Sequence, residues 1–241
     1  MNTLPPAAEP STSSAAAHAT AVETRDAAGQ LVSRMPMLDG VPHGQVVMYG
    51  AGAVPVLEAH YEHGALSGVA RTFDATGALL LEANYAAGQL HGATTTWEDG
   101  RVALRQHYAH GVLHGTSVSY APSGLATSRF NYEAGKLTGE ALHLHEGVVV
   151  RRAPYRKGVL EGETRDYTGD GKLVQTSPYK GGLLHGTLRR YGADGRVSDE
   201  RAYENGKPLG AARKVAAPPP QEGLATGGQR LAKQLEKWVK G

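Results

Sequence analysis

The chain has 241 residues, a net charge of +2 and no cysteine, which excludes disulfide bonds and cysteine-ligated zinc as the forces that hold the fold. No apolar run approaches the roughly 20 residues that a membrane-spanning helix needs, so we expect no transmembrane segment. Residues 211–241 carry a net charge of +4, whereas residues 37–210 carry −1. The body of the chain therefore gives no electrostatic argument for nucleic-acid binding.

The first 20 residues are rich in Ala, Ser, Thr and Pro. This composition is typical of a disordered segment, and we expect a disordered leader over residues 1–20. The segment lacks the basic start and the long apolar stretch of a secretory signal. We therefore expect a cytoplasmic protein.

Residues 21–210 contain an internal repeat with a period of 23 to 24 residues. Its units open on Tyr-x-x-Gly-x-x-x-Gly, and a second large apolar residue follows five residues after the second glycine, as Tyr120 follows Gly115. All 11 tyrosines occupy one of these two positions. Such a period is typical of repeat architectures. The residues that define the unit are Tyr61, Tyr85, Tyr108, Tyr132, Tyr155, Tyr179 and Tyr203, with the glycines Gly64, Gly88, Gly111, Gly135, Gly158 and Gly182.

The side-chain pattern within a unit predicts β-hairpins. Large residues alternate with period two, as at Leu79, Leu81 and Tyr85, and helical periodicity is absent. Asp-Gly, Glu-Gly and Asn-Gly pairs supply the positive φ that hairpin turns require. Turns that are one residue shorter, ending at Gly100 and Gly147, account for the units of 23 residues. We predict an all-β fold: an elongated, single-layer antiparallel β-meander of tandem hairpins.

Such a ribbon has few large side chains with which to build an interior. We expect the tyrosines and the second aromatic position to form one apolar face that serves as its core, and the second glycine of each unit to mark a bulge. The alternative is that these rings form a stacking platform for bases or sugars.

The 11 histidines raise the question of a metal site, most of all His107, His110 and His114, whose imidazoles could approach a zinc geometry on one hairpin turn. However, His114 and its equivalents recur at the same place in several units, as a repeat consensus would place them. No nucleophile, acid and base stand together, and no glycine-rich phosphate loop is present. We therefore predict no enzyme, no catalytic residue, no metal site and no cofactor.

The end of the chain differs in composition. Residues 211–228 form a linker rich in Pro and Gly, and residues 229–240 have the periodicity of a short basic amphipathic helix. This helix could lie on an anionic membrane, dock in a partner's groove or fold back onto the ribbon. The binding residues predicted in it are Arg230, Lys233, Lys237, Trp238 and Lys240.

The units YENGKPLG, YEAGKLTG and YAAGQLHG, each continued by the rest of the repeat, resemble the variant MORN repeats (membrane occupation and recognition nexus) of bacterial proteins. The resemblance is to the antitoxin-like and immunity-like group in particular, and it covers eight copies. It implies a non-catalytic protein-interaction module whose partner is a toxin or a secreted effector. The alternative is a membrane-associated scaffold that uses the basic C-terminal helix, and the oligomeric state is left open.

Overall fold

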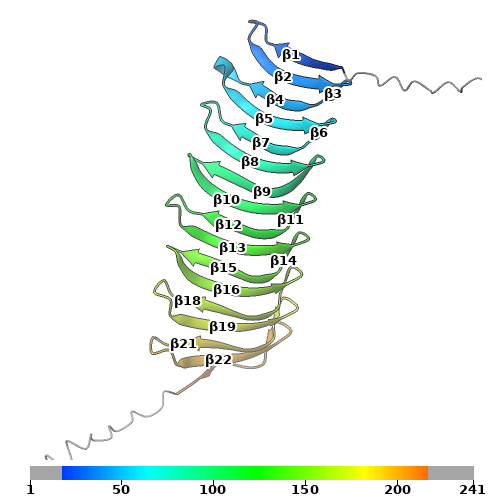
Figure 1. The fold of residues 1–241 in the computed structure, drawn as a ribbon. Helices are drawn as coiled ribbons and strands as arrows, with labels where there is room; N and C mark the ends of the chain where they lie inside the picture. The colour runs from blue at the N-terminus through cyan, green and yellow to red at the C-terminus, as the bar shows by residue number, and fades with distance from the viewer. Residues whose placement is uncertain (1–17, 217–241) are drawn as a thin grey trace, which may run out of the picture.

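The fold was analysed in a computed structural model, which describes residues 18–216 (Figure 1). The described residues form one 24-stranded sheet in which each long strand pairs with the long strands before and after it in the chain, and each two-residue segment pairs with the long strand before it. The strands lie across the long axis of a ribbon that is one layer thick, and each strand is curved (Figure 1). The predicted all-β, single-layer antiparallel meander is confirmed for this part of the chain.

The strands fall into long ones and two-residue segments. The long strands are β1 Ala19–Arg25, β2 Leu31–Leu38, β4 Gly44–Tyr49, β5 Pro55–Glu62, β7 Gly68–Phe73, β8 Leu79–Ala86, β9 Gln89–Glu98, β10 Arg101–Ala109, β12 Gly115–Tyr120, β13 Ala126–Glu133, β15 Gly139–His145, β16 Val148–Arg156, β18 Gly162–Tyr167, β19 Leu173–Lys180, β21 Gly186–Tyr191 and β22 Val197–Glu204. The short segments are β3 Val41–Pro42, β6 Ala65–Leu66, β11 Val112–Leu113, β14 Lys136–Leu137, β17 Val159–Leu160, β20 Leu183–Leu184, β23 Lys207–Pro208 and β24 Arg213–Lys214. A 3-10 turn, η1 Ala51–Ala53, connects β4 to β5.

Most short segments arise because the second glycine of the unit divides a strand. Gly115, with φ of 97°, begins β12, and one residue separates it from β11. The strand does not end there, because the His114 N–H donates to the His107 carbonyl oxygen at 2.9 Å and keeps the chain beside β10. The sequence predicted an irregularity at this glycine, and the division explains why 24 segments appear although only 16 of them are long strands.

Two-residue turns close the hairpins along the long edge of the ribbon at which the units open. In the turn before β11, His110 and Gly111 have φ of 50° and 79°, and positive φ at both central residues defines a type I′ turn. The shorter mid-unit turns have the same form, with φ of 49° and 72° at Asp99 and Gly100. The missing residue in these turns thus converts a longer loop into a type I′ turn.

The first glycine of each unit also joins one hairpin to the hairpin before it. The N–H of Gly64 donates to the Pro42 carbonyl oxygen at 2.8 Å, in the short segment of the preceding unit. The same bond recurs along the ribbon, from Gly88 to Leu66, Gly111 to Leu90, Gly135 to Leu113, Gly158 to Leu137, Gly182 to Leu160 and Gly206 to Leu184.

The interior is made of small side chains. One row on what we call the small-residue face holds nearly all the buried residues, namely Val46, Ala59, Ala70, Ala83, Thr94, Ser117, Ala141, Ala153, Thr164 and Ser177. All 11 tyrosines are half-buried. The tyrosine that opens each unit lies on this face, because Tyr85 follows Ala83 by two residues.

The expectation of a single apolar face was wrong. Ala70 pairs with Ala83, and Phe73 lies three residues after Ala70, so the alternation of a strand places Phe73 on the opposite face from Tyr85. The second aromatic position of the other units, such as Tyr120, has the same placement. Each face of the ribbon therefore carries one row of large side chains.

The strands extend beyond both predicted limits of the array. β1 begins at Ala19, inside the segment expected to be a disordered leader, and β24 pairs with β22 beyond residue 210. The rest of that leader, most of the linker and the predicted helix over residues 229–240 lie outside the described residues. Within residues 18–216, no helix is long and apolar enough to cross a bilayer.

Candidate functional site

A continuous row of charged and apolar residues runs along the face opposite the buried row, and we call this face the arginine face. Each member pairs directly with the next across neighbouring strands, so the row extends from β1 to β24. Its members are Glu23, Arg34, Val47, Glu58, Arg71, Glu82, Thr95, Arg105, Val118, Arg129, Leu142, Arg152, Arg165, Thr176, Arg189, Glu200 and Arg213.

Most arginines of this row have a carboxylate partner. Arg71 pairs with Glu82 at 2.8 Å and Arg189 with Glu200 at 3.7 Å. Two more arginines, Arg152 and Arg165, pair with Glu140 at 2.8 Å and Glu163 at 3.1 Å. Arg34, Arg105 and Arg129 differ, since no carboxylate of the described residues lies within 4.0 Å of their guanidinium groups, and of these three only Arg105 and Arg129 lie close together.

These two arginines line the same hollow in the arginine face, a groove of about 560 Å³ that crosses β10, β12, β13 and β15. The guanidinium of Arg105 lies over the ring of Tyr120, with its central carbon 5.8 Å from the ring centroid. Aliphatic side chains supply much of the remaining wall, and no lining residue is acidic. The full lining is Arg105, His107, Thr116, Val118, Tyr120, Ala126, Arg129, Leu142 and Leu144.

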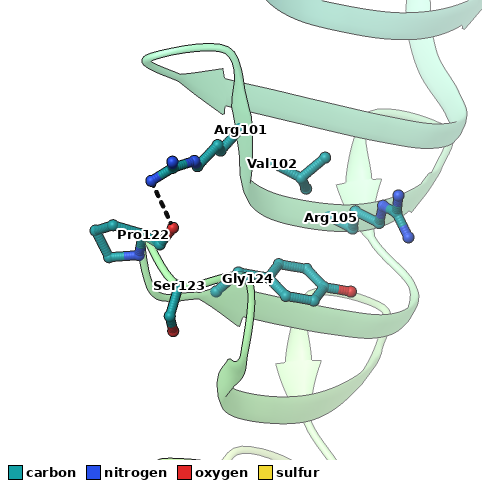
Figure 2. Close-up of a pocket in the computed structure, with 7 residues that line it drawn as sticks. Arg101, Val102, Arg105, Pro122, Ser123 and Gly124 are labelled. Atoms are coloured by element: carbon teal, nitrogen blue, oxygen red, sulfur yellow. Dashed lines mark hydrogen bonds between the residues drawn. The ribbon is translucent and has the colours of Figure 1, made fainter.

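The groove continues toward the turns that connect β12 to β13. A neighbouring hollow of about 410 Å³ shares Arg105 with it and reaches Pro122 (Figure 2). Arg101 extends over this end, and its Nη1 donates to the Pro122 carbonyl oxygen at 2.9 Å (Figure 2). That hydrogen bond ties the turn before β10 to the next turn along the ribbon. It fixes Arg101 at the rim, while the guanidinium groups of Arg105 and Arg129 within the groove have no carboxylate partner among the described residues.

The arginines of the groove are candidate functional residues that the repeat pattern did not reveal. Arg105 and Arg129 each lie three residues before an opening tyrosine, and Arg152 has the same position in the following unit. Three arginines at one repeat position were therefore visible in the sequence. That Arg105 and Arg129 lack a carboxylate partner, whereas Arg152 has one, depends on neighbouring strands and could not be read from that position alone.

The binding residues predicted in the tail, Arg230, Lys233, Lys237, Trp238 and Lys240, lie outside the described residues. The opening tyrosines lie on the small-residue face, away from the groove, and the opening glycines lie in the turns. Neither set contributes a side chain to the groove.

The histidines form contacts that follow the repeat. The rings of His43 and His63 meet edge to face with centroids 5.1 Å apart, and those of His91 and His110 do the same at 5.1 Å. His110 is thus paired with a histidine of the preceding unit. Across residues 18–216, no three side chains among His, Asp and Glu are grouped so that they could hold a metal ion.

The carboxyl groups with displaced pKa values lie in exposed mid-unit turns. A hydrogen bond from the Thr76 hydroxyl, followed by bonds from backbone N–H groups, lowers the pKa of Asp74 below its ordinary value. A bond from Lys172 does the same for the pKa of Asp170. Both interactions order turns, and neither residue lines the groove.

Residues 160–180, which include β18, match the MORN repeat variant family. No curated protein matches the chain. MORN repeats generally mediate protein or membrane interactions and are generally not enzymes. The repeat, the hairpin ribbon and the match together support a MORN-repeat protein.

Proposed function

We propose that the chain is a non-catalytic, cytoplasmic protein-interaction module, and that it acts as an antitoxin or immunity protein that neutralises a cognate toxin or secreted effector by binding it. The groove of the arginine face is the observation that supports this proposal most directly. It is an open surface hollow with a largely apolar lining and two guanidinium groups that have no carboxylate partner among the described residues. Recognition of proteins commonly combines such apolar contacts with a few charged anchors.

The resemblance to bacterial variant MORN repeats supports the antitoxin or immunity part of this proposal. Neutralisation by binding requires a stable surface rather than a water-excluding reaction site, and a one-layer ribbon offers the former. The groove lies near the middle of the array, where strands on both sides hold its walls in place (Figure 1). A partner bound there would meet a pre-formed site, which reduces the conformational entropy lost on binding.

The test compares the full chain with a variant whose groove is filled. Ala126→Trp places a large ring in the groove, and Leu79→Trp makes a comparable change at the equivalent position of another unit. Proteins retained by the wild type from an extract of the native organism are identified, and each is purified and titrated by calorimetry. We expect Ala126→Trp to abolish retention and Leu79→Trp to preserve it. Equal binding by all three proteins would contradict a role for the groove.

The alternative function is a membrane-associated scaffold anchored by the tail, favoured by the net charge of +4 in residues 211–241. A full-length variant with Arg230, Lys233, Lys237 and Lys240 changed to Gln separates the two. If this variant loses the partner and loses binding to anionic vesicles, while Ala126→Trp keeps both, the scaffold explanation replaces ours.

A further inference from the structure

The chemistry of the groove indicates what kind of protein segment it accepts. Resting on the proposed function, we propose that the groove binds an acidic segment of the partner, whose carboxylates pair with Arg105 and Arg129 and whose apolar side chain packs between them. A guanidinium binds a carboxylate through two parallel hydrogen bonds, which gives direction as well as attraction.

The charges along the row favour this occupant. The next arginine of the row, Arg152, is already neutralised by Glu140 at 2.8 Å. Arg105 and Arg129 instead face a hollow whose lining contains no acid and one additional basic side chain, His107. A cationic segment would meet uncompensated repulsion in this hollow, whereas a carboxylate supplies the partner that both arginines lack.

The spacing of the two arginines determines how far apart the carboxylates of the bound segment lie. Arg105 and Arg129 flank Val118 on adjacent strands, so their backbones lie two strand spacings apart, or about 10 Å. Tyr120 holds the guanidinium of Arg105 over its ring. The segment therefore presents two carboxylates about 10 Å apart, with an apolar side chain between them that reaches Val118.

A lipid surface fits this site less well than a protein segment. The apolar residues that line the groove of about 560 Å³ are half-buried, whereas Arg105 and Arg129 beside them are exposed, so a side chain can enter between the arginines. A bilayer surface presents headgroups that meet protruding side chains first, and it leaves an apolar recess unfilled. The apolar lining between the arginines thus argues for a side chain that accompanies the carboxylates.

The test uses polymers of known chemistry and the full-length protein. The probes are a random glutamate–tyrosine copolymer, a lysine–tyrosine copolymer of equal composition, polyglutamate, and vesicles with and without phosphatidylserine. The test variant is Arg105→Gln with Arg129→Gln. Its matched control is Arg71→Gln with Arg189→Gln, which makes the same change in charge on the same row at arginines that already have partners.

We expect the glutamate–tyrosine copolymer to bind the wild type about tenfold more tightly than the Arg105 and Arg129 double variant, because two charge-assisted pairs are lost. The control variant should bind within about twofold of the wild type, polyglutamate more weakly than the copolymer, and the lysine–tyrosine copolymer not at all. Affinity should fall as salt rises through the range in which exposed charges are screened. Unchanged thermal midpoints would show that both double variants are folded.

Three outcomes would overturn the inference: no binding of the glutamate–tyrosine copolymer, equal losses in both double variants, or a groove-dependent preference for phosphatidylserine vesicles over the copolymer. The experiments distinguish a failure of the acidic-segment inference from a failure of the proposed function. If Ala126→Trp loses the natural partner while the Arg105 and Arg129 double variant retains it, the groove binds a partner that is not recognised through carboxylates. If the copolymer binds as expected but the natural partner is unaffected by Ala126→Trp, the proposed function fails instead.

Discussion

Thr164 and Ser177 face each other across β18 and β19, and both are at most 2% exposed although the sheet has a single layer. The Thr164 hydroxyl donates to the Ser177 carbonyl oxygen at 3.3 Å. A single layer can enclose such small side chains only beneath larger ones on the same face, and Tyr179 lies two residues after Ser177. The opening tyrosines therefore act as a cover over a row of small residues.

Loss of an interior tyrosine should destabilise the ribbon more than loss of the last one. Tyr155→Ala uncovers Ala153 and its partner Ala141, and we expect a loss of about 2 kcal/mol, below the value for a fully buried aromatic side chain because Tyr155 is half-buried. Tyr203→Ala should cost about 1 kcal/mol, since fewer strands follow it. Urea denaturation measures both. Equal losses would argue against a cover that acts between neighbouring units.

The tight mid-unit turns require glycine for backbone reasons alone. Gly100 has φ of 72° and no atom near the position of an added Cβ, so Gly100→Ala should cost about 1–2 kcal/mol through the left-handed conformation. Gly169 has equally open surroundings without a positive φ, and Gly169→Ala should change stability by less than about 0.5 kcal/mol. Thermal unfolding compares the two. An unchanged stability of Gly100→Ala would mean that this turn adopts another backbone conformation in the variant.

Replacing the second glycine of a unit by alanine should cost different amounts of stability in different units. An added Cβ at Gly186 would lie 3.0 Å from Cγ of Pro178, whereas at Gly139 it would meet nothing within 4 Å. Both residues have positive φ, of 114° at Gly186 and 70° at Gly139, so a second substitution is needed to separate the clash with the proline from backbone strain. We expect Gly186→Ala to cost at least about 1 kcal/mol more than Gly139→Ala, as overpacking does elsewhere. Adding Pro178→Ala to Gly186→Ala should recover part of this loss, and no recovery would exclude the clash as its cause.

Asp74 should make one turn sensitive to acid. The Thr76 hydroxyl and the N–H groups of Thr76 and Ala78 bind its carboxylate, which lowers its pKa in the folded protein below the ordinary value of 3.8. The stabilisation is therefore complete above the unfolded pKa and is lost as pH falls through the folded pKa. We expect Asp74→Asn to lower the thermal midpoint by a constant amount at neutral pH, and this difference should shrink below about pH 4. A difference that does not change with pH would rule out the charge as its source.

The hairpins could be predicted from the sequence because each depends on local chemistry. The pair Asp99 and Gly100 adopts the type I′ turn that its residues favour. The alternation of side chains before Tyr85 indicates which residues lie on each face of β8. Even the polar start of the array follows the repeat. Arg25 pairs with Leu31 after a shift in register, as Tyr120 pairs with Ala126 further along.

The groove could not be predicted, because it depends on how separate hairpins align. Whether Tyr120 shares a face with Arg105 or with Tyr108 follows from the register between β10 and β12, which the period alone does not specify. The pairing of β15 with β16 gives Arg152 the partner Glu140, whereas no neighbouring strand offers Arg129 a carboxylate. The small size of the core residues was visible in the sequence, but a single-layer sheet was expected to bury its largest side chains.

The bonds from each opening glycine to the carbonyl of the preceding unit, such as Gly135 to Leu113, run along the ribbon together with the ladders between strands. A pulling force applied at the two ends therefore acts along these bonds, and each junction between hairpins is held by few of them. Under tension, we expect the ribbon to unfold one hairpin at a time, starting from an end. Each hairpin that opens releases 23 to 24 residues, or about 80 Å of extended chain, at a nearly constant force.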